Sequence, residues 1–209
     1  MLKNITDLVD QVAAAADEIE SARRLPDSLV RELKKAGAFR ALMPTKFGGL
    51  GAEFEDYVYM VQALAKADAS TAWCVNQAAV IGLTSLWLPE ERIREIWASP
   101  ETSIANGPPF NCLIEPDGDQ FKLNGHWGFS SGCQHATWML GAAKYAGGGY
   151  RIAYFRPDDV SFSDNWQVPG LRGTGSFEFT ISDLSIDASL VTDLAASPTH
   201  LCDLTITPS

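Results

Sequence analysis

The sequence predicts an α+β fold, in which an N-terminal helical domain is followed by an antiparallel β-barrel-like domain. Two observations predict this order. Over about the first hundred residues, apolar side chains recur every three or four positions, which is the spacing of amphipathic helices. From Pro100 onward the apolar period falls to two, and short apolar runs alternate with turn residues, as is typical of strands. We therefore expect an all-α domain at residues 1–100 and a β-domain at residues 101–209.

The helical half is expected to contain five helices. The first covers residues 5–19, where the apolar spacing is three and four. Pro26 begins the second, because the first helical turn does not need its missing N–H, and Gly37 ends it as a C-cap. Residues 43–51 form a loop, since glycine is a poor helix former and this segment is rich in it. The remaining helices are expected over residues 53–67, 70–86 and 89–97, with capping side chains at 68–71.

Strands are expected in the second half over residues 121–123, 137–140, 151–155, 160–162 and 177–181. Asp117-Gly118 and Asn124-Gly125 are hairpin-turn pairs, because both residue types tolerate the left-handed backbone of a tight turn. Residues 147–149, three consecutive glycines, are expected to form a flexible hairpin between two strands. Strands separated by turn clusters in this way predict a small barrel or sandwich.

Composition narrows the possible partners. The chain has 209 residues, of which 46% are hydrophobic and 20% charged, so it can bury a substantial core. A net charge of −10 with scattered basic residues makes nucleic acid and anionic membranes poor partners. An uninterrupted apolar run of about 18 residues is absent, as is the basic-then-apolar order of a signal peptide. Four widely spaced cysteines without a Cys-x-x-Cys pair are expected to be thiols in a reducing cytoplasm.

The most informative segment runs from Gly125 to Trp138. It places Gly128 and Gly132 within apparent β-structure, where glycine is disfavoured because it packs no side chain. Something is therefore expected to approach the backbone closely, with Phe129, Ser130 and Ser131 facing it. Two interpretations stay open: a flat aromatic ligand with polar edges, or a barrel corner with well-packed aromatic side chains.

Other kinds of chemistry are less well supported by the sequence. Residues 128–132 match the Gly-x-Ser-x-Gly nucleophile elbow, but that motif needs a helix after its turn, and residues 133–140 are expected to form a strand. His126, Cys133 and His135 are close in sequence, yet alternation along a strand scatters them over both faces, so no metal site is expected. Residues 115–119 are acidic but too short for a calcium loop, and are expected to form a solvated turn.

Four stretches together resemble the acyl-CoA dehydrogenase superfamily, and resemble more closely its branch of two-component flavin-dependent monooxygenases. They are residues 43–51 (MPTKFGGLG), 68–73 (DASTAW), 125–138 (GHWGFSSGCQHATW) and 170–176 (GLRGTGS). The resemblance implies that a C-terminal helical bundle would begin near residues 200–209. It also implies a cytoplasmic oxidoreductase that uses reduced FMN or FAD with O2 to oxygenate an aromatic or polycyclic small molecule.

The resemblance further implies roles for individual residues. Phe129 would lie against the isoalloxazine ring, with Ser130 beside it, and Ser131 would act as the catalytic hydroxyl at the central nitrogen or carbonyl edge. The backbone of Ala105, Asn106 and Gly107 would contact the pyrimidine edge.

The implied partners are a flavin reductase, together with either a second copy of the chain or a separate helical subunit. Two alternatives stay open. One is a shortened, flavin-free relative that acts as a binding or assembly partner. The other is an enzyme similar to the acyl-CoA dehydrogenases themselves.

Overall fold

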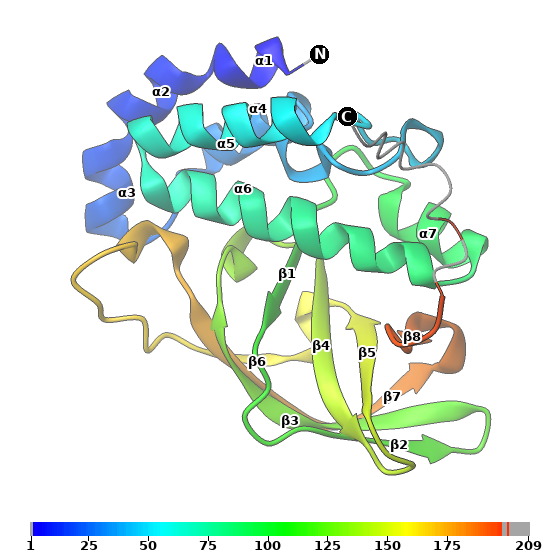
Figure 1. Cartoon of the computed structure of the whole chain (residues 1–209). Helices are drawn as coiled ribbons and strands as arrows, with labels where there is room; N and C mark the ends of the chain where they lie inside the picture. The colour runs from blue at the N-terminus through cyan, green and yellow to red at the C-terminus, as the bar shows by residue number, and fades with distance from the viewer. Residues whose placement is uncertain (1, 198–199, 201–209) are drawn as a thin grey trace.

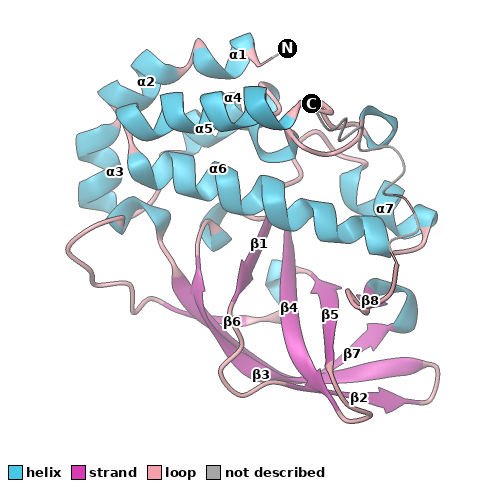
Figure 2. Ribbon diagram, viewed as in Figure 1, coloured by secondary structure: helices cyan, strands magenta, loops and turns pink. Residues whose placement is uncertain are grey.

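The computed structural model describes residues 2–197 and residue 200, and these form two layers (Figure 1). The first layer is helical and the second is a sheet, with α6 (Ala69–Gly82) running along the boundary between them (Figure 2). The predicted α+β order is confirmed. The exact division into domains at residue 100 stays a prediction, and the expected start of a C-terminal bundle falls largely outside the described residues.

The helical layer confirms most of the expected helices. Its other members are α1 (Lys3–Thr6), α2 (Val9–Ala14), α3 (Ala16–Ala22), α4 (Asp27–Lys35), α5 (Phe54–Ala67) and α7 (Glu90–Trp97). The single helix expected over residues 5–19 is instead three short helices. Ile5, Val12 and Ile19 each bury fully against the same core, so the heptad spacing is kept although the helix is interrupted. Among the described residues, no helix is long and apolar enough to cross a membrane.

The expected helix ends follow from local chemistry. The Asp68 carboxylate accepts a hydrogen bond from the Thr71 backbone N–H at 2.6 Å, which satisfies a free donor at the start of α6. Gly37 follows α4 with a φ of 81°, the left-handed conformation that glycine adopts without strain. α6 ends at Gly82, earlier than expected, and a 3-10 turn over Leu83–Trp87 continues it. A Cβ atom on Gly82 would lie 2.8 Å from the Trp97 ring, so this glycine makes room for α7.

The sheet contains eight strands among the described residues. They are β1 (Ile104–Gly107), β2 (Leu113–Asp117), β3 (Gln120–Ser130), β4 (Trp138–Tyr145), β5 (Tyr150–Phe155), β6 (Ser161–Ser163), β7 (Phe177–Asp187) and β8 (Val191–Thr192). The main path runs β6-β7-β3-β2-β4-β5-β8, and β1 pairs with β4. β1, β2 and β8 are additions to the expected strands.

The sheet is mixed, so the prediction of a purely antiparallel sheet was wrong. β1 pairs in parallel with residues 138–141 of β4, and β2 pairs in parallel with residues 144–145 of the same strand. β1 and then β2 lie alongside successive parts of β4 and run in the same direction as β4, so both are parallel to it. Periodicity along the sequence does not encode this arrangement, because strands of either orientation alternate their side chains in the same way.

One of the two expected hairpin turns was also wrong. Asp117 pairs with Gln120 across the predicted turn at Gly118, which confirms the first hairpin. Asn124 and Gly125 instead lie inside β3, where the pairing with β7 shifts register. The Asn124 side chain accepts a hydrogen bond from the Asp183 backbone N–H at 2.8 Å. A Cβ atom on Gly125 would lie 2.6 Å from the Cys112 sulfur, so the glycine is needed for packing rather than for a turn.

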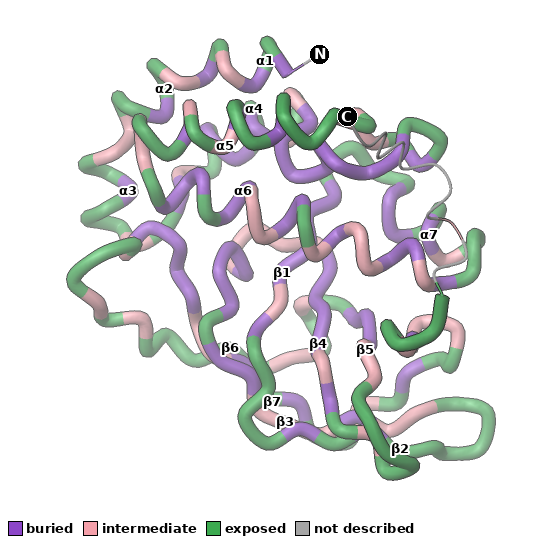
Figure 3. Tube along the Cα trace, viewed as in Figure 1, coloured by how far each residue is buried: buried purple, intermediate pink, exposed green. Residues whose placement is uncertain are grey.

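Buried residues occur throughout both layers (Figure 3). The helical layer has its own core, and a second core lies within the sheet. A third cluster lies between the layers and includes Phe47 and Trp97 from the helical half with Trp138 and Tyr154 from the sheet. Ile81 of α6 packs against this third cluster, so packing holds the end of α6 over the sheet.

Candidate functional site

A cavity of about 320 Å³ lies where α6, the sheet and the loop between β6 and β7 meet. Trp73 and Gln77, one helical turn apart on α6, form one wall. The sheet side contributes Asn106 in β1 and Pro108 directly after it, together with Phe129 and Ser131 at the end of β3. The loop contributes the remaining lining residues, which are Trp166, Leu171, Thr174 and Ser176.

Phe129 is held in an unusual backbone conformation at this site. Its φ is 54°, in the left-handed region that side chains with a Cβ atom rarely adopt. This conformation lies at a register shift, because two residues separate Trp127 from Ser130 in β3 whereas one residue separates Phe179 from Phe177 in β7. The ring is 55% exposed and meets Phe110 and Trp166 edge-on, with ring centroids 6.1 Å and 5.9 Å away. Phe129 is therefore a strained, exposed aromatic residue that lines the cavity.

Ser131 lies at one end of a row of hydroxyl groups. The Trp73 indole N–H donates a hydrogen bond to its Oγ at 2.9 Å. Ser131 Oγ is 2.7 Å from Ser176 Oγ, which is 2.6 Å from Thr174 Oγ1. The three hydroxyl residues are buried, yet all of them line the cavity. The site therefore combines aromatic walls with a short polar floor.

The glycines near the site make room for the protein itself. A Cβ atom on Gly128 would lie 2.4 Å from the Phe110 ring, so this glycine accommodates a well-packed aromatic side chain. A Cβ atom on Gly107 would lie 2.3 Å from the Gly128 carbonyl oxygen, so β1 and β3 can approach only because residue 107 is glycine. Gly128 therefore fits the interpretation of a well-packed aromatic corner, and the interpretation of a flat aromatic ligand facing Phe129 stays a prediction.

The residues expected at the site fall into two groups. Phe129, Ser131 and Asn106 line the cavity. Ser130, Ala105 and Gly107 are buried and do not line it, because alternation along a strand turns neighbouring side chains to opposite faces. The roles expected for all six stay predictions.

Several lining residues were not expected. Trp73, Leu171, Thr174 and Ser176 lie within the family-like stretches 68–73 and 170–176, but no role was predicted for their side chains. Gln77 and Trp166 lie outside those stretches, and only the fold brings them close to Ser131.

The segment after Ser131 corrects another prediction. Residues 133–137 are not strand: Gly132 is left-handed, with a φ of 76°, and begins a 3-10 turn over Cys133–His135. β4 begins at Trp138. A nucleophile elbow requires an α-helix directly after the serine, and here a 3-10 turn and then β4 follow it instead.

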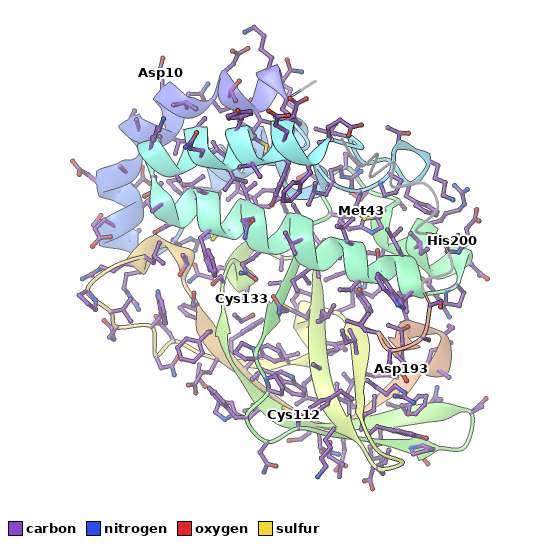
Figure 4. The ribbon with its side chains drawn as sticks, viewed as in Figure 1. Asp10, Met43, Cys112, Cys133, Asp193 and His200 are labelled. Atoms are coloured by element: carbon purple, nitrogen blue, oxygen red, sulfur yellow. The ribbon has the colours of Figure 1, made fainter. Side chains whose placement is uncertain are left out.

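The nearby histidines and cysteines have structural partners. His126 Nε2 is 2.8 Å from a Glu178 carboxylate oxygen, and the described residues contain no group of three His, Cys, Asp or Glu side chains that could hold a metal. Cys74, Cys112 and Cys133 are buried free thiols. Burial raises the pKa of Cys133 to about 12, so it stays protonated. Cys133 lies near the helical layer and Cys112 farther into the sheet (Figure 4), and Cys202 lies outside the described residues.

The cavity suits the edge of a flat aromatic cofactor. Its volume is at the lower end of the range of small-molecule sites, and its lining combines apolar rings with a few polar groups that converge. Flavins present both features that this lining can recognise, a planar aromatic face and a rim of nitrogen and oxygen atoms.

Comparison with known proteins identifies the family. The model of the acyl-CoA dehydrogenase N-terminal domain matches residues 1–96. The oxygenase component of p-hydroxyphenylacetate 3-hydroxylase from Acinetobacter baumannii is 32% identical over 185 residues, which are 84% of this chain and 43% of that protein. The chain belongs to the acyl-CoA dehydrogenase superfamily.

Other similar proteins are named as flavin-dependent monooxygenases. The oxygenase subunit HsaA of a flavin-dependent monooxygenase from Mycobacterium tuberculosis is 30% identical, over 89% of this chain and 48% of that protein. A crystal structure of HsaA from the same organism matches with a TM-score of 0.90 and 25% identity, over 98% of this chain and 56% of that one. The chain spans about half the length of the curated relatives it matches.

Proposed function

We propose that this chain forms the flavin-contacting part of the oxygenase component of a two-component monooxygenase that hydroxylates an aromatic or polycyclic small molecule. The observation that carries this proposal is the Ser131 hydroxyl, held beside the strained and exposed Phe129 in an aromatic-walled cavity. Relatives named for such chemistry support it, among them an FADH2-dependent resorcinol hydroxylase from Rhizobium that is 32% identical over 89% of this chain.

The residues divide the work of holding reduced FMN or FAD. Phe129 would lie against the ring, and Ser131 would meet the central nitrogen at its edge. Asn106 and the backbone of Ala105 and Gly107 would meet the pyrimidine edge. When bound, reduced flavin supplies the reaction with O2, while the protein supplies binding, orientation and exclusion of water. Ser130 would support this surface from beneath, since its side chain is fully buried.

The proposed partners are a flavin reductase and either a second copy of this chain or a separate helical subunit. The outward faces of α5 and α6 support contact with another protein chain, either a second copy or a helical subunit. Phe54, Tyr59 and Val80 are 73%, 61% and 44% exposed there, and apolar groups of this size are commonly covered by another chain. The buried free thiols fit the reducing conditions of the cytoplasm, where we propose that the protein acts.

Anaerobic titration with reduced FMN and with reduced FAD tests the proposal. We expect saturable binding by the 209-residue chain, weakened roughly fivefold in Ser131→Ala, which loses one neutral hydrogen bond. Ser161→Ala, on an exposed position of β6, is the matched control and should bind like the parent.

Failure of both flavins to bind the parent chain at millimolar concentration would overturn the proposal. The exposed apolar faces of α5 and α6 would then favour an assembly role without flavin.

A further inference from the structure

Four side chains at the cavity form a hydrogen-bond chain that runs in one direction. The chain begins at the Trp73 indole, passes through the hydroxyl groups of Ser131, Ser176 and Thr174, and ends at the Leu171 carbonyl. We propose that this hydrogen-bond chain fixes Ser131 as a hydrogen-bond acceptor toward the cavity, so that the site favours a flavin carrying N–H at its central nitrogen. Trp73, Ser176 and Thr174 are therefore positioning residues.

The two ends of the chain determine its direction. An indole N–H can only donate, so Ser131 Oγ accepts from Trp73. A backbone carbonyl can only accept, so the hydroxyl of Thr174 donates to Leu171 O, at 2.9 Å.

The single proton of each hydroxyl then settles the two middle bonds. Because the Thr174 proton is already used, Ser176 must donate to Thr174 across their 2.6 Å contact. Because the Ser176 proton is then used, Ser131 must donate to Ser176 across 2.7 Å. Each of these three residues is at most 7% exposed, so solvent does not readily take over these bonds.

The consequence for the cavity is chemical selectivity. Ser131 lines the cavity with its proton turned away from it, and the remaining lone pair of its Oγ is free to accept. The central nitrogen of a reduced flavin carries a hydrogen and can donate to that lone pair. In the oxidised flavin the same nitrogen is an acceptor and would meet another acceptor. This inference rests on the proposed flavin site and goes beyond it, because it assigns the orientation of the Ser131 proton to Trp73, Ser176 and Thr174.

The ratio of the two dissociation constants, oxidised over reduced, is the quantity to measure for FMN and FAD under anaerobic conditions. We expect the parent chain to bind the reduced form more tightly. In Ser176→Ala the Ser131 proton loses its acceptor and can turn toward the cavity, so the ratio should fall roughly three- to tenfold, the value of about one hydrogen bond.

A pair of variants at Thr174 separates this effect from a general loss of packing. Thr174→Val removes the acceptor of the Ser176 proton and should lower the ratio in the same direction, although Thr174 makes no bond to Ser131. Thr174→Ser keeps a hydroxyl and should restore the ratio of the parent. This pair also decides the matter if Ser176→Ala does not fold.

The outcomes distinguish the two proposals. If the parent binds neither form, both the flavin site and the preference for the reduced form are overturned. If the parent binds flavin but the ratio stays within twofold in Ser176→Ala or Thr174→Val, the flavin site stands and the directed hydrogen-bond chain is rejected as its cause.

Discussion

At the scale of single residues, the left-handed backbone of Phe129 lowers the stability of the fold, and a role of the ring in binding would explain why it is kept. A left-handed backbone at a residue with a Cβ atom costs roughly 1–2 kcal/mol, and the exposed ring recovers little of this by burial. The same conformation turns Phe129 toward the cavity and leaves Ser130 and Ser131 on opposite sides of the strand end. The strain is thus coupled to the geometry that brings the ring and the serine hydroxyl together.

Substitution of Phe129 separates stability from binding. Phe129→Gly relieves the backbone strain, so it should be more stable than Phe129→Ala by about 1 kcal/mol. Both variants lack the ring and should bind reduced flavin more weakly than the parent. Urea unfolding and anaerobic titration measure the two effects. Equal stability of the glycine and alanine variants would show that the left-handed conformation carries no cost here.

At the scale of elements, the loop between β6 and β7 depends on the helical layer. Arg23, at the end of α3, donates two parallel hydrogen bonds to the Asp164 carboxylate, each 2.6 Å long, and a third to the Trp166 carbonyl at 3.1 Å. These bonds hold the pKa of Asp164 below its ordinary value and raise that of Arg23. Arg172 Nε also donates to the Glu20 carbonyl at 3.2 Å. α3 therefore positions the loop that supplies Trp166 and Leu171 to the cavity.

Replacing the planar guanidinium tests this attachment. Arg23→Lys keeps the charge but cannot form two parallel bonds, so we expect faster amide hydrogen exchange at residues 164–171 and weaker flavin binding. Arg24→Lys is the matched control, because Arg24 pairs only locally with Asp27 in the described structure. Unchanged exchange in Arg23→Lys would mean that the loop is held by its apolar contacts instead.

At the scale of the whole molecule, His135 lies at the junction of the two layers. Its ring packs against Phe39 with centroids 5.2 Å apart, and its backbone carbonyl accepts hydrogen bonds from Lys34 and Ser103. Burial, followed by the positive charges of Lys34 and Arg24, lowers the pKa of His135 below its usual value near 6.5. The folded protein therefore keeps this imidazole neutral where the unfolded chain would bind a proton.

The sign of the resulting pH dependence is fixed. Below pH 6.5 the unfolded state gains a proton that the folded state does not, so the free energy of unfolding should fall as pH decreases from about 6.5 to 5. We expect a loss of about 1–2 kcal/mol over this window, measured by urea unfolding at each pH. His135→Gln removes the titrating group and should show a flatter profile. An identical slope in the variant would assign the acid sensitivity to other groups.

Much of the fold could be predicted because it follows from local chemistry. Helical spacing located α4, α5 and α7, the Asp68 cap and Gly37 fixed two helix ends, and the Asp117-Gly118 pair located one hairpin. The motif at residues 125–138 also predicted Phe129 and Ser131 as site residues, and both line the cavity. These features depend on neighbours within a few positions, so the sequence by itself determined them.

Only the tertiary structure decided the rest, because it depends on contacts between distant segments. The Asn124-Gly125 pair satisfies the rules for a turn, but Cys112 occupies the space beside Gly125 and β3 continues through it. β1 and then β2 pair in parallel with successive parts of β4. The alternation of side chains along a strand cannot specify this pairing. The direction of the Ser131 proton depends on Trp73, Ser176 and Thr174, which meet only when α6 and the β6–β7 loop pack over the end of β3.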